Sequence, residues 1–483
     1  KHNRTMKVFK AEQIKRCDEH TIEYESIASI DLMERAVSAC FEWIKNNYPD
    51  DYNFYIFCGK GNNGGDGLAL ARMLLNENYN VAAYIIQSSA DFSEDASINF
   101  EKYPESVEFI EGGDFEIPGG KALIIDALFG TGLNKPLSGV AEKIVAELNT
   151  IHAKKLSIDI PSGLFSDELP GENQTIFRAD DTLSFGFYKR SFFHKEAAQY
   201  VGDIHVLDIG LSEDFIEKEK SANYILSKEE VIANFKVRDP FGNKGDFGKL
   251  VLIGGSHGKI GAINLSTQAA LRVGTGIVFT LAPECGYQVL QTTAPEAMFV
   301  SGGETGISEI NLPSEDVTIG IGPGLGMEKS TQKALESLLK KNKKPLVIDA
   351  DALNSIAENK ELLKLLPENT IITPHPKEFE RLFGKTDSSL KQCELAREKA
   401  KEYKIIIVLK GHRTAILTPS GDCCYNVTGN AGMAKGGSGD VLTGIIAGLL
   451  AQGYEPVWAA LLGVYIHGWA GDYAALKYSQ EAM

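Results

Sequence analysis

The chain has 483 residues, of which 43% are hydrophobic and 24% are charged. This length is more than one ordinary hydrophobic core serves, so two or three globular domains are expected. The net charge of −16 disfavours nucleic acid and anionic membrane surfaces as partners. No apolar run reaches the roughly 18 residues that a membrane span requires. The most apolar window, residues 441–453, is predicted to be a buried helix.

The seven cysteines have no paired spacing, which indicates reduced thiols. Adjacent Cys423 and Cys424 suit neither an ordinary disulfide nor a tetrahedral zinc site. No stretch resembles a signal peptide, so a cytoplasmic location is expected. Residues 1–5 precede Met6, where the natural start is expected, and they are excluded from the fold prediction.

Two series of apolar runs, with helical periodicity between them as at residues 67–77, are predicted to be buried strands. Continuous apolar strands separated by helices predict parallel sheets covered on both faces. The charged segment 211–231 separates the series, so the domains are expected at residues 1–220 and 221–483. The predicted fold class is α/β, with two tandem three-layer αβα domains. The first series comprises residues 54–59, 80–87, 121–130, 154–163 and 180–187, and the second 249–255, 276–283, 316–324, 344–351, 369–376 and 404–411.

In the first half, the segment CGKGNNGGDG (58–67) follows a predicted strand and opens a predicted helix. Gly59, Gly61 and Gly64 match the G-x-G-x-x-G pattern of Rossmann-like dinucleotide-binding folds. The acidic residue expected after the next strand is missing, because Gln87 and serines stand there. Two interpretations therefore stay open. The segment is a tight strand-to-helix turn, or its backbone amides bind phosphate at a helix N-terminus.

Polar side chains also mark the ends of two later strands in this half. Asp126 and Asp159 lie at strand ends, and Ser162 follows shortly after. A lone aspartate at such a position is more often a helix cap, but ligands of parallel α/β sheets bind at the carboxyl ends of the strands. The oxygen atoms of Asn63, Asp126 and Ser162 form a set that suits a hard monovalent cation.

These motifs, together with DALFGTGL (126–133), SIDIPSG (157–163) and LMERA (32–36), resemble the family of NAD(P)HX epimerases over essentially all of residues 6–210. The resemblance implies a potassium ion at Asn63, Asp126 and Ser162, and it makes Asp159 the candidate for substrate contact and proton transfer. Lys189 lies where a substrate-side lysine is plausible, but the family usually continues with glycine and proline, which leaves its role open. The residues implied to hold the substrate phosphates are Asn62, Asn63, Gly64, Gly65, Asp66, Gly130, Thr131, Gly132, Leu133, Asn134, Lys135 and Pro136.

The second half also carries strand-end loops, GGSHGKIGA (254–262), IGPGLG (321–326) and VIDADALN (347–354). The aspartates of the last loop are explained equally well as helix caps and as site residues. His375 stands between two prolines at a strand end. A lone histidine is usually structural, but one held rigidly in such a loop is a better site candidate.

The strongest signal is GGSGD (436–440), which leads directly into an apolar helix. Successive amides at the start of a helix form an anion-binding hole. Asp440 lies one position inside it, where a carboxylate suits a general base that accepts a hydroxyl proton beside a transferring phosphoryl group. Aspartate is also a common N-cap, but the glycines and serine before it disfavour a role as a cap alone.

Together with HPKE (375–378), VLKGHRT (408–414) and IHGWAGD (466–472), this signal resembles the ribokinase-like superfamily, and within it the ADP- or ATP-dependent NAD(P)H-hydrate dehydratases, over residues 244–483. The family usually continues into another C-terminal helix, so truncation or disorder is expected after Met483. The resemblance implies that Ala262, Gly324, His375 and Asp440 contact the hydrate, and that Lys410, Gly411, His412, Arg413, Thr414 and Gly439 bind the adenine nucleotide.

The two resemblances imply a bifunctional isomerase and lyase that repairs hydrated nicotinamide cofactors. The first half would interconvert the R and S epimers of NADHX and NADPHX. The second would use ADP, favoured over ATP by the tandem fusion, to dehydrate the S epimer to NAD(P)H with release of AMP and phosphate. Potassium at the epimerase site, magnesium, and a homo-oligomeric state are expected. The alternative is a ribokinase-like kinase of a vitamin precursor fused to a non-catalytic nucleotide-binding module.

Overall fold

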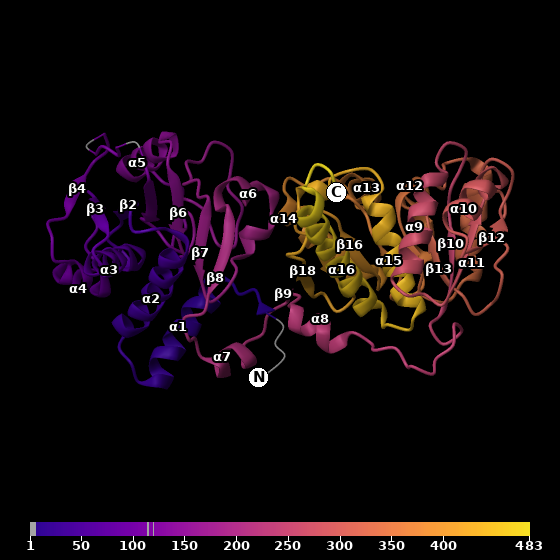
Figure 1. Cartoon of the computed structure of the whole chain (residues 1–483), viewed down its shortest axis with the longest axis horizontal. Helices are drawn as coiled ribbons and strands as arrows, with labels where there is room; N and C mark the ends of the chain where they lie inside the picture. The colour runs from indigo at the N-terminus through magenta and orange to yellow at the C-terminus, as the bar shows by residue number, and fades with distance from the viewer. Residues whose placement is uncertain (1–5, 114, 119) are drawn as a thin grey trace. The chain divides into compact units, whose positions relative to one another are not determined.

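The computed structural model describes residues 6–113, 115–118 and 120–483, so the excluded residues 1–5 lie outside it (Figure 1). The described chain divides into two compact units, residues 7–221 and residues 222–483, the latter joined by Met6. The division falls inside the charged segment 211–231. This segment is structured, because it contains α7 (Glu213–Lys218), β9 (Asn223–Ile225) and α8 (Lys228–Asn234).

The N-terminal unit is built on a parallel sheet with the strand order β4-β3-β2-β5-β6-β7-β8. Each strand predicted in the first series overlaps an observed strand. The order reverses between β2 and β5, and such a switch point is where α/β sheets bind ligands. The chain begins with β1 (Met6–Lys7), a strand of the other sheet. The elements that follow are α1 (Ala11–Glu25), α2 (Ser29–Asn47), β2 (Asn53–Cys58), α3 (Asn62–Asn76), β3 (Asn80–Ile86), α4 (Glu94–Lys102), β4 (Glu108–Ile110), β5 (Ala122–Ala127), α5 (Gly139–Thr150), β6 (Lys154–Ile158), β7 (Asp181–Phe185), the short helix η1 (Arg190–Phe193), α6 (Lys195–Val201) and β8 (Asp203–Leu207).

Side chains of this sheet alternate between two hydrophobic cores. Phe54 and Ile56 of β2 pack in one cluster with residues of α2 and α3. Tyr55 and Phe57, the alternate residues, pack in a second cluster with residues of α5. Because successive side chains of a strand point to opposite faces, helices cover both faces of the sheet. The predicted three-layer α/β architecture is confirmed for this unit.

The C-terminal unit has a larger sheet with the order β1-β9-β18-β17-β16-β15-β14-β13-β10-β11-β12. Each strand predicted in the second series again overlaps an observed one. The new elements are β10 (Lys249–Ile253), α9 (Ile260–Arg272), β11 (Ile277–Ala282), η2 (Glu284–Gly286), α10 (Tyr287–Thr293), β12 (Met298–Ser301), β13 (Thr318–Ile321), α11 (Lys329–Lys341), β14 (Val347–Ile348), α12 (Ala350–Glu358), η3 (Lys360–Leu365), β15 (Ile371–Ile372), α13 (Pro376–Phe383), α14 (Ser389–Tyr403), β16 (Ile406–Leu409), β17 (Ala415–Leu417), β18 (Cys423–Tyr425), η4 (Ala431–Met433), α15 (Ser438–Ala451) and α16 (Pro456–Tyr478).

Two features of this sheet differ from the prediction. The strand β17 runs antiparallel to both of its neighbours, β16 and β18, whereas a parallel sheet was expected throughout. The strand predicted over 344–351 is short, because α12 already begins at Ala350. In both places the strand ends earlier in the sequence than the apolar run that predicted it.

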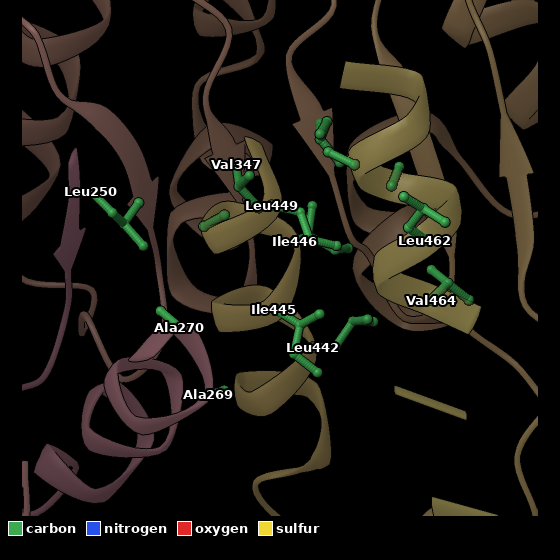
Figure 2. Packing of buried hydrophobic residues seen from close by; sticks show 14 of the residues in the cluster. Leu250, Ala269, Ala270, Val347, Leu442, Ile445, Ile446, Leu449, Leu462 and Val464 are labelled. Carbon is green, nitrogen blue, oxygen red and sulfur yellow. The ribbon is translucent and has the colours of Figure 1, made fainter. Parts of the chain in front are cut away.

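The apolar helix α15 lies at the centre of the C-terminal core. It packs against α9 and α16, and Leu442, Ile445, Ile446 and Leu449 belong to one buried cluster with strand residues such as Val347 (Figure 2). The prediction of a buried helix over 441–453 is confirmed. Among the described residues, no helix is both long and apolar enough to cross a membrane.

Candidate active sites

The turn from β2 to α3 brings backbone amides to the switch point of the N-terminal sheet. A Cβ atom on Gly64 would lie 1.8 Å from the carbonyl oxygen of Gly59, so the turn closes only with glycine. The helix α3 begins at Asn62 behind Gly61, which provides no side-chain cap. The segment is thus a tight turn whose first helical amides are left open toward an anion.

Asp126 lies at the end of β5 with its carboxylate fully buried. It accepts hydrogen bonds from the hydroxyl of Ser157 (3.0 Å), from the hydroxyl and amide of Ser162 (2.6 and 2.7 Å), and from the amide of Leu128 (3.2 Å). Burial raises the pKa of Asp126 to about 6, although these hydrogen bonds lower it. The hydroxyl of Ser162 also accepts from the amide of Phe129 (2.9 Å), which ties the strand-end loops together.

Asn63 completes the set predicted to bind a cation. Its side chain is buried, and neither the amide oxygen nor the amide nitrogen has a hydrogen-bond partner among the described residues. A Cβ atom on Gly130 would lie 3.8 Å from Oδ1 of Asn63, so the exposed loop 130–136 begins beside this amide. An unsatisfied buried amide is expected to cost about 1–3 kcal/mol, which marks a place for a ligand or an ion.

Asp159 follows β6 and forms an ion pair with Lys189. The carboxylate Oδ1 lies 2.7 Å from Nζ of Lys189, whose side chain has no exposed surface. Asp159 has a positive φ of 66°, a left-handed conformation that aspartate adopts more readily than bulkier residues. Its Oδ1 also accepts from the amide of Phe185 (3.2 Å). The structure therefore gives Lys189, whose role the motif left open, a definite partner.

Two further carboxyl groups interact electrostatically with this pair. Burial raises the pKa of Asp18 on α1 to about 7, with a contribution from the negative charge of Asp159, while Lys189 opposes the increase. Burial also places the pKa of Asp66 well above its usual range, again with contributions from Asp159 and Asp18. Sequence reasoning missed Asp18. Its only signal is its position on the face of α1 that buries Ile14, Cys17 and Thr21.

In the C-terminal unit, the loops after β10 and β13 meet at a second switch point. The hydroxyl of Ser256 donates to the carbonyl of Gly324 (2.9 Å). A Cβ atom on Gly324 would lie 3.1 Å from Cβ of Ala262, so these two residues predicted to contact the hydrate are neighbours. Gly324 also has a positive φ of 62°.

Asp440 lies in the first turn of α15, which begins at Ser438. The preceding Gly437 has a φ of 91°, a conformation that favours glycine, and no side chain caps the helix. Asp440 is partly exposed, and burial raises its pKa to about 6 with a contribution from the charge of Asp349. It is the third helical residue, so it does not act as the N-cap.

A buried ion pair supports this helix start. Nζ of Lys410 lies 3.0 Å from Oδ1 of Asp349, and the hydroxyl of Thr443 donates to Oδ2 (2.7 Å). Asp349 is the residue before α12, yet its side chain makes no cap hydrogen bond. Of the two interpretations of VIDADALN, helix cap and site, Asp349 fits the second. A Cβ atom on Gly439 would lie 3.4 Å from Nζ of Lys410, which brings two predicted nucleotide-binding residues together.

His375 acts as the N-cap of α13. Its Nδ1 accepts from the amides of Lys377 (3.1 Å) and Glu378 (3.3 Å), and the carboxylate of Glu378 accepts from the amide of His375 (2.8 Å). This capping box explains the position between two prolines structurally. The ring remains partly exposed, so Nε2 is the atom that can face a ligand.

The remaining predicted nucleotide loop joins β16 to β17. Gly411 and His412 are exposed, and the guanidinium of Arg413 donates to the carbonyl of Val427 (2.6 Å). Thr414 pairs with Asn426 through the backbone (2.9 Å). The loop is thereby fixed against residues 426–430, the segment that leads to GGSGD.

Two residues of IHGWAGD have roles that the motif did not specify. The carboxylate of Asp472 accepts from the amide of Gly429 and from the side chain of Asn430, both at 2.9 Å. Nε2 of His467 lies 3.4 Å from the hydroxyl of Ser438. Burial lowers the pKa of His467 to about 4, so the ring is neutral where it meets the start of α15.

Two family models match separate halves of the chain. The family model described as NAD(P)H-hydrate dehydratase matches residues 250–483, and the model described as YjeF-related protein N-terminus matches residues 29–191. The bifunctional NAD(P)H-hydrate repair enzyme of Moorella thermoacetica is 35% identical over 95% of this chain and 90% of its own length. The chain belongs to the family of bifunctional NAD(P)H-hydrate repair enzymes. The family and the pairing of isomerase and lyase predicted from the motifs are thus confirmed.

Other relatives in the repair-enzyme family show similar coverage. The enzyme of Escherichia coli is 34% identical over 99% of this chain and 91% of its own length. Among solved structures, the ADP/ATP-dependent NAD(P)H-hydrate dehydratase of Bacillus subtilis, co-crystallised with ATP and Mg²⁺, is 31% identical with a TM-score of 0.47. It covers 54% of this chain, and 92% of that protein is matched.

Proposed function

We propose that this repair enzyme epimerises NADHX and NADPHX in residues 1–220 and dehydrates the S epimers with ADP in residues 221–483. The observation that carries the proposal is the position of Asp440. A partly exposed carboxylate stands in the first turn of an uncapped helix, beside the Lys410–Asp349 ion pair. The names of the relatives, which refer to NAD(P)H-hydrate and to ADP or ATP, support the same assignment.

In the dehydratase site, Asp440 accepts the proton of the substrate hydroxyl as the terminal phosphoryl group of ADP is transferred to that oxygen and AMP leaves. The first-turn amides of α15 and the ammonium group of Lys410 stabilise the charge of the moving phosphoryl group. Phosphate is then eliminated with a ring proton, which restores the double bond of NAD(P)H. We assign the hydrate contacts to Ala262, Gly324 and His375, and the nucleotide contacts to residues 410–414 and Gly439.

Magnesium bound with the nucleotide would neutralise part of the phosphate charge. The described residues contain no cluster of three or more histidine, cysteine, aspartate or glutamate side chains that would hold a metal ion. A site without such a cluster is compatible with magnesium, because this ion is often held mainly by phosphates and water.

In the epimerase site, the open amides of residues 62–66 and the loop 130–136 hold the phosphates of the substrate, and Asp159 accepts a proton from it. In the same site, Asn63, Asp126 and Ser162 would hold a potassium ion. A buried carboxylate without an ion-pair partner in the described chain, together with a buried amide that makes no hydrogen bond there, suits a singly charged ion with oxygen ligands. Bound potassium would supply compensating positive charge close to the substrate phosphates.

The potassium assignment predicts separate ion requirements for the two activities. Replacing potassium with equimolar tetramethylammonium, at fixed magnesium, is expected to slow epimerisation roughly tenfold or more, the effect of losing about 1.4 kcal/mol of interaction. Dehydration of the S epimer should be unchanged. Chromatographic separation of the two epimers measures the first rate, and NADH absorbance measures the second. Epimerisation at an unaltered rate in tetramethylammonium would contradict the cation site.

The central experiment incubates mixed NADHX epimers with ADP and magnesium. Complete recovery of NADH absorbance is expected, because the R epimer is converted as the S epimer is consumed. Recovery that stops at the S fraction would contradict the epimerase assignment. Accumulation of a stable phosphorylated product without NADH would instead identify the C-terminal unit as a kinase.

The environment of Asp440 predicts the pH dependence of dehydration. The base must be a carboxylate, and its pKa is raised to about 6 by burial and by Asp349, while Lys410 lowers it. Activity is therefore lost as pH falls below about 6, at close to tenfold per pH unit. The measurement is kcat/KM for S-NADHX between about pH 5 and 8, with unfolding followed over the same range. A flat profile to about pH 4.5 would contradict the role of Asp440.

We further place the enzyme in the cytoplasm as a homo-oligomer. The seven cysteines form no disulfide in the described chain, as expected in a reducing compartment. Trp469, Tyr473 and Leu476 are exposed on one side of α16, and an apolar row of this kind supports self-association. Sedimentation of the full chain tests the oligomeric state.

A further inference from the structure

The epimerase site contains more carboxyl groups than it can hold as anions. Asp18, Asp66 and Asp159 interact electrostatically with one another, and Lys189 is the cation among them. Only Asp159 contacts the lysine, through an ion pair of 2.7 Å. Buried like charges cannot all ionise together, so a carboxyl group in such a cluster retains its proton. The site is thus equipped with a carboxylate and a carboxylic acid at the same time.

The position of Asp18 follows from the packing of α1. Cys17, the preceding residue, belongs to a buried cluster with Phe187, which lies two residues before Lys189. The hydroxyl of Thr21, one turn after Asp18, accepts from the amide of Ser212 (2.9 Å). The helix is therefore held against the segment 187–212 on both sides of Asp18. Asp18 interacts electrostatically with the carboxylate of Asp159, the ammonium of Lys189 and, on its own helix, Glu19.

We propose that Asp18 is the general acid of the epimerase and the partner of Asp159, its general base. This inference rests on the proposed epimerase function and adds the second half of its proton chemistry. Asp66 is less suited to the role because it is almost fully buried, at 8% exposure, whereas Asp18 is partly exposed and can exchange its proton with water.

The reaction needs one acid and one base. The substrate carbon that must invert carries a hydroxyl group and is bonded to the ring nitrogen. Asp159 takes the hydroxyl proton, the bond between this carbon and the ring nitrogen breaks, and the carbon becomes an aldehyde. The ring nitrogen keeps the electron pair of the broken bond and takes the proton of Asp18. Rotation of the aldehyde followed by the reverse steps closes the ring with the opposite configuration and returns both protons, so no other reactant is consumed.

The test compares Asp18→Asn, Asp18→Glu and Glu23→Gln in the full chain, starting from one enriched epimer without nucleotide. Asp18→Asn is expected to lower the rate of epimerisation roughly a hundredfold or more, the usual contribution of a general acid. Asp18→Glu, which restores an acid, should recover part of the rate. Glu23→Gln, at an exposed position on the same helix, should match the wild type.

A pH profile separates an acid from a structural residue. The pKa of Asp18 is raised to about 7, so wild-type kcat should fall above about pH 7 as the acid loses its proton. The residual activity of Asp18→Asn should lack this alkaline decrease. Near wild-type activity of Asp18→Asn, or an unchanged alkaline decrease in that variant, would overturn the proposal. Thermal unfolding shows whether the variant is folded; if it is not, a folded Asp18→Glu variant that fails to epimerise would overturn the proposal. A wild-type chain that does not interconvert epimers would instead refute the epimerase function itself.

Discussion

Asp440→Asn is expected to abolish dehydration, with a loss of roughly a hundredfold to ten-thousandfold in rate, and to leave epimerisation unchanged. Asparagine has the shape of aspartate but cannot accept the hydroxyl proton of the substrate, and the contribution of a general base is of this size. The substitution leaves the helix start intact, because Asp440 is not its cap and Gly437 sets the turn. NADH formation from the S epimer with ADP measures the effect.

Two controls make the result on Asp440 specific. Glu455→Gln removes an exposed acidic group just before α16 and should retain wild-type dehydration. Interconversion of the epimers without ADP reports on the other unit of the same chain and should be normal. A variant Asp440→Asn that retains dehydration within about threefold of the wild type, less than about 0.7 kcal/mol of transition-state free energy, would rule out the assigned base.

Asp159→Asn is expected to stop epimerisation and also to destabilise the N-terminal unit. Asparagine tolerates the positive φ of 66° at this position, so the backbone needs no rearrangement. The substitution removes the negative partner of Lys189, whose side chain is fully buried. Breaking a buried ion pair in this way typically costs about 3–5 kcal/mol. Recovery of NADH from mixed epimers should then stop when the S epimer is exhausted.

A second variant separates the two effects of Asp159→Asn. The double variant Asp159→Asn/Lys189→Met removes the unpaired charge and should be more stable to urea than Asp159→Asn alone, while remaining inactive as an epimerase. Stability regained without activity assigns the catalytic loss to the missing base. If Asp159→Asn epimerises at the wild-type rate, Asp159 is not the proton acceptor. Rapid assays are needed because the epimers also interconvert without enzyme, which would hide the point at which the S epimer is exhausted.

The parts of the fold that sequence reasoning recovered are those with long local signals. The strands of both series are continuous apolar runs, and the five residues of GGSGD predict where α15 begins. The hairpin of β17 and β18 was missed because each strand has only three residues and the chain between them turns at Ser420 and Gly421. Such short strands are specified by their neighbours in the sheet and not by their own pattern.

In the candidate sites, too, local sequence patterns could not predict the role of single side chains whose partners are distant in the sequence. The motif could not decide whether Asp349 caps α12 or enters a site, because both roles place an aspartate at the end of a strand. Its contacts with Lys410 and Thr443 distinguish them, and both partners are distant in the sequence. Asp18 lies outside every motif, 141 residues before Asp159 in the sequence. Only the folded chain brings its helix to the site of Asp159.

The edge of the C-terminal sheet has a consequence for where this half can be cut from the chain. β9 pairs in parallel with β18, matching Asn223 to Cys423, although the dehydratase family model begins only at residue 250. Arg397 secures the same junction by donating to the carbonyls of Ala222 and Gly421. A fragment starting at residue 250 would uncover the unpaired backbone of β18, the kind of edge on which proteins aggregate. The smallest fragment expected to fold as a dehydratase therefore begins near residue 222. The segment that joins the two units is thus a structural part of the C-terminal enzyme.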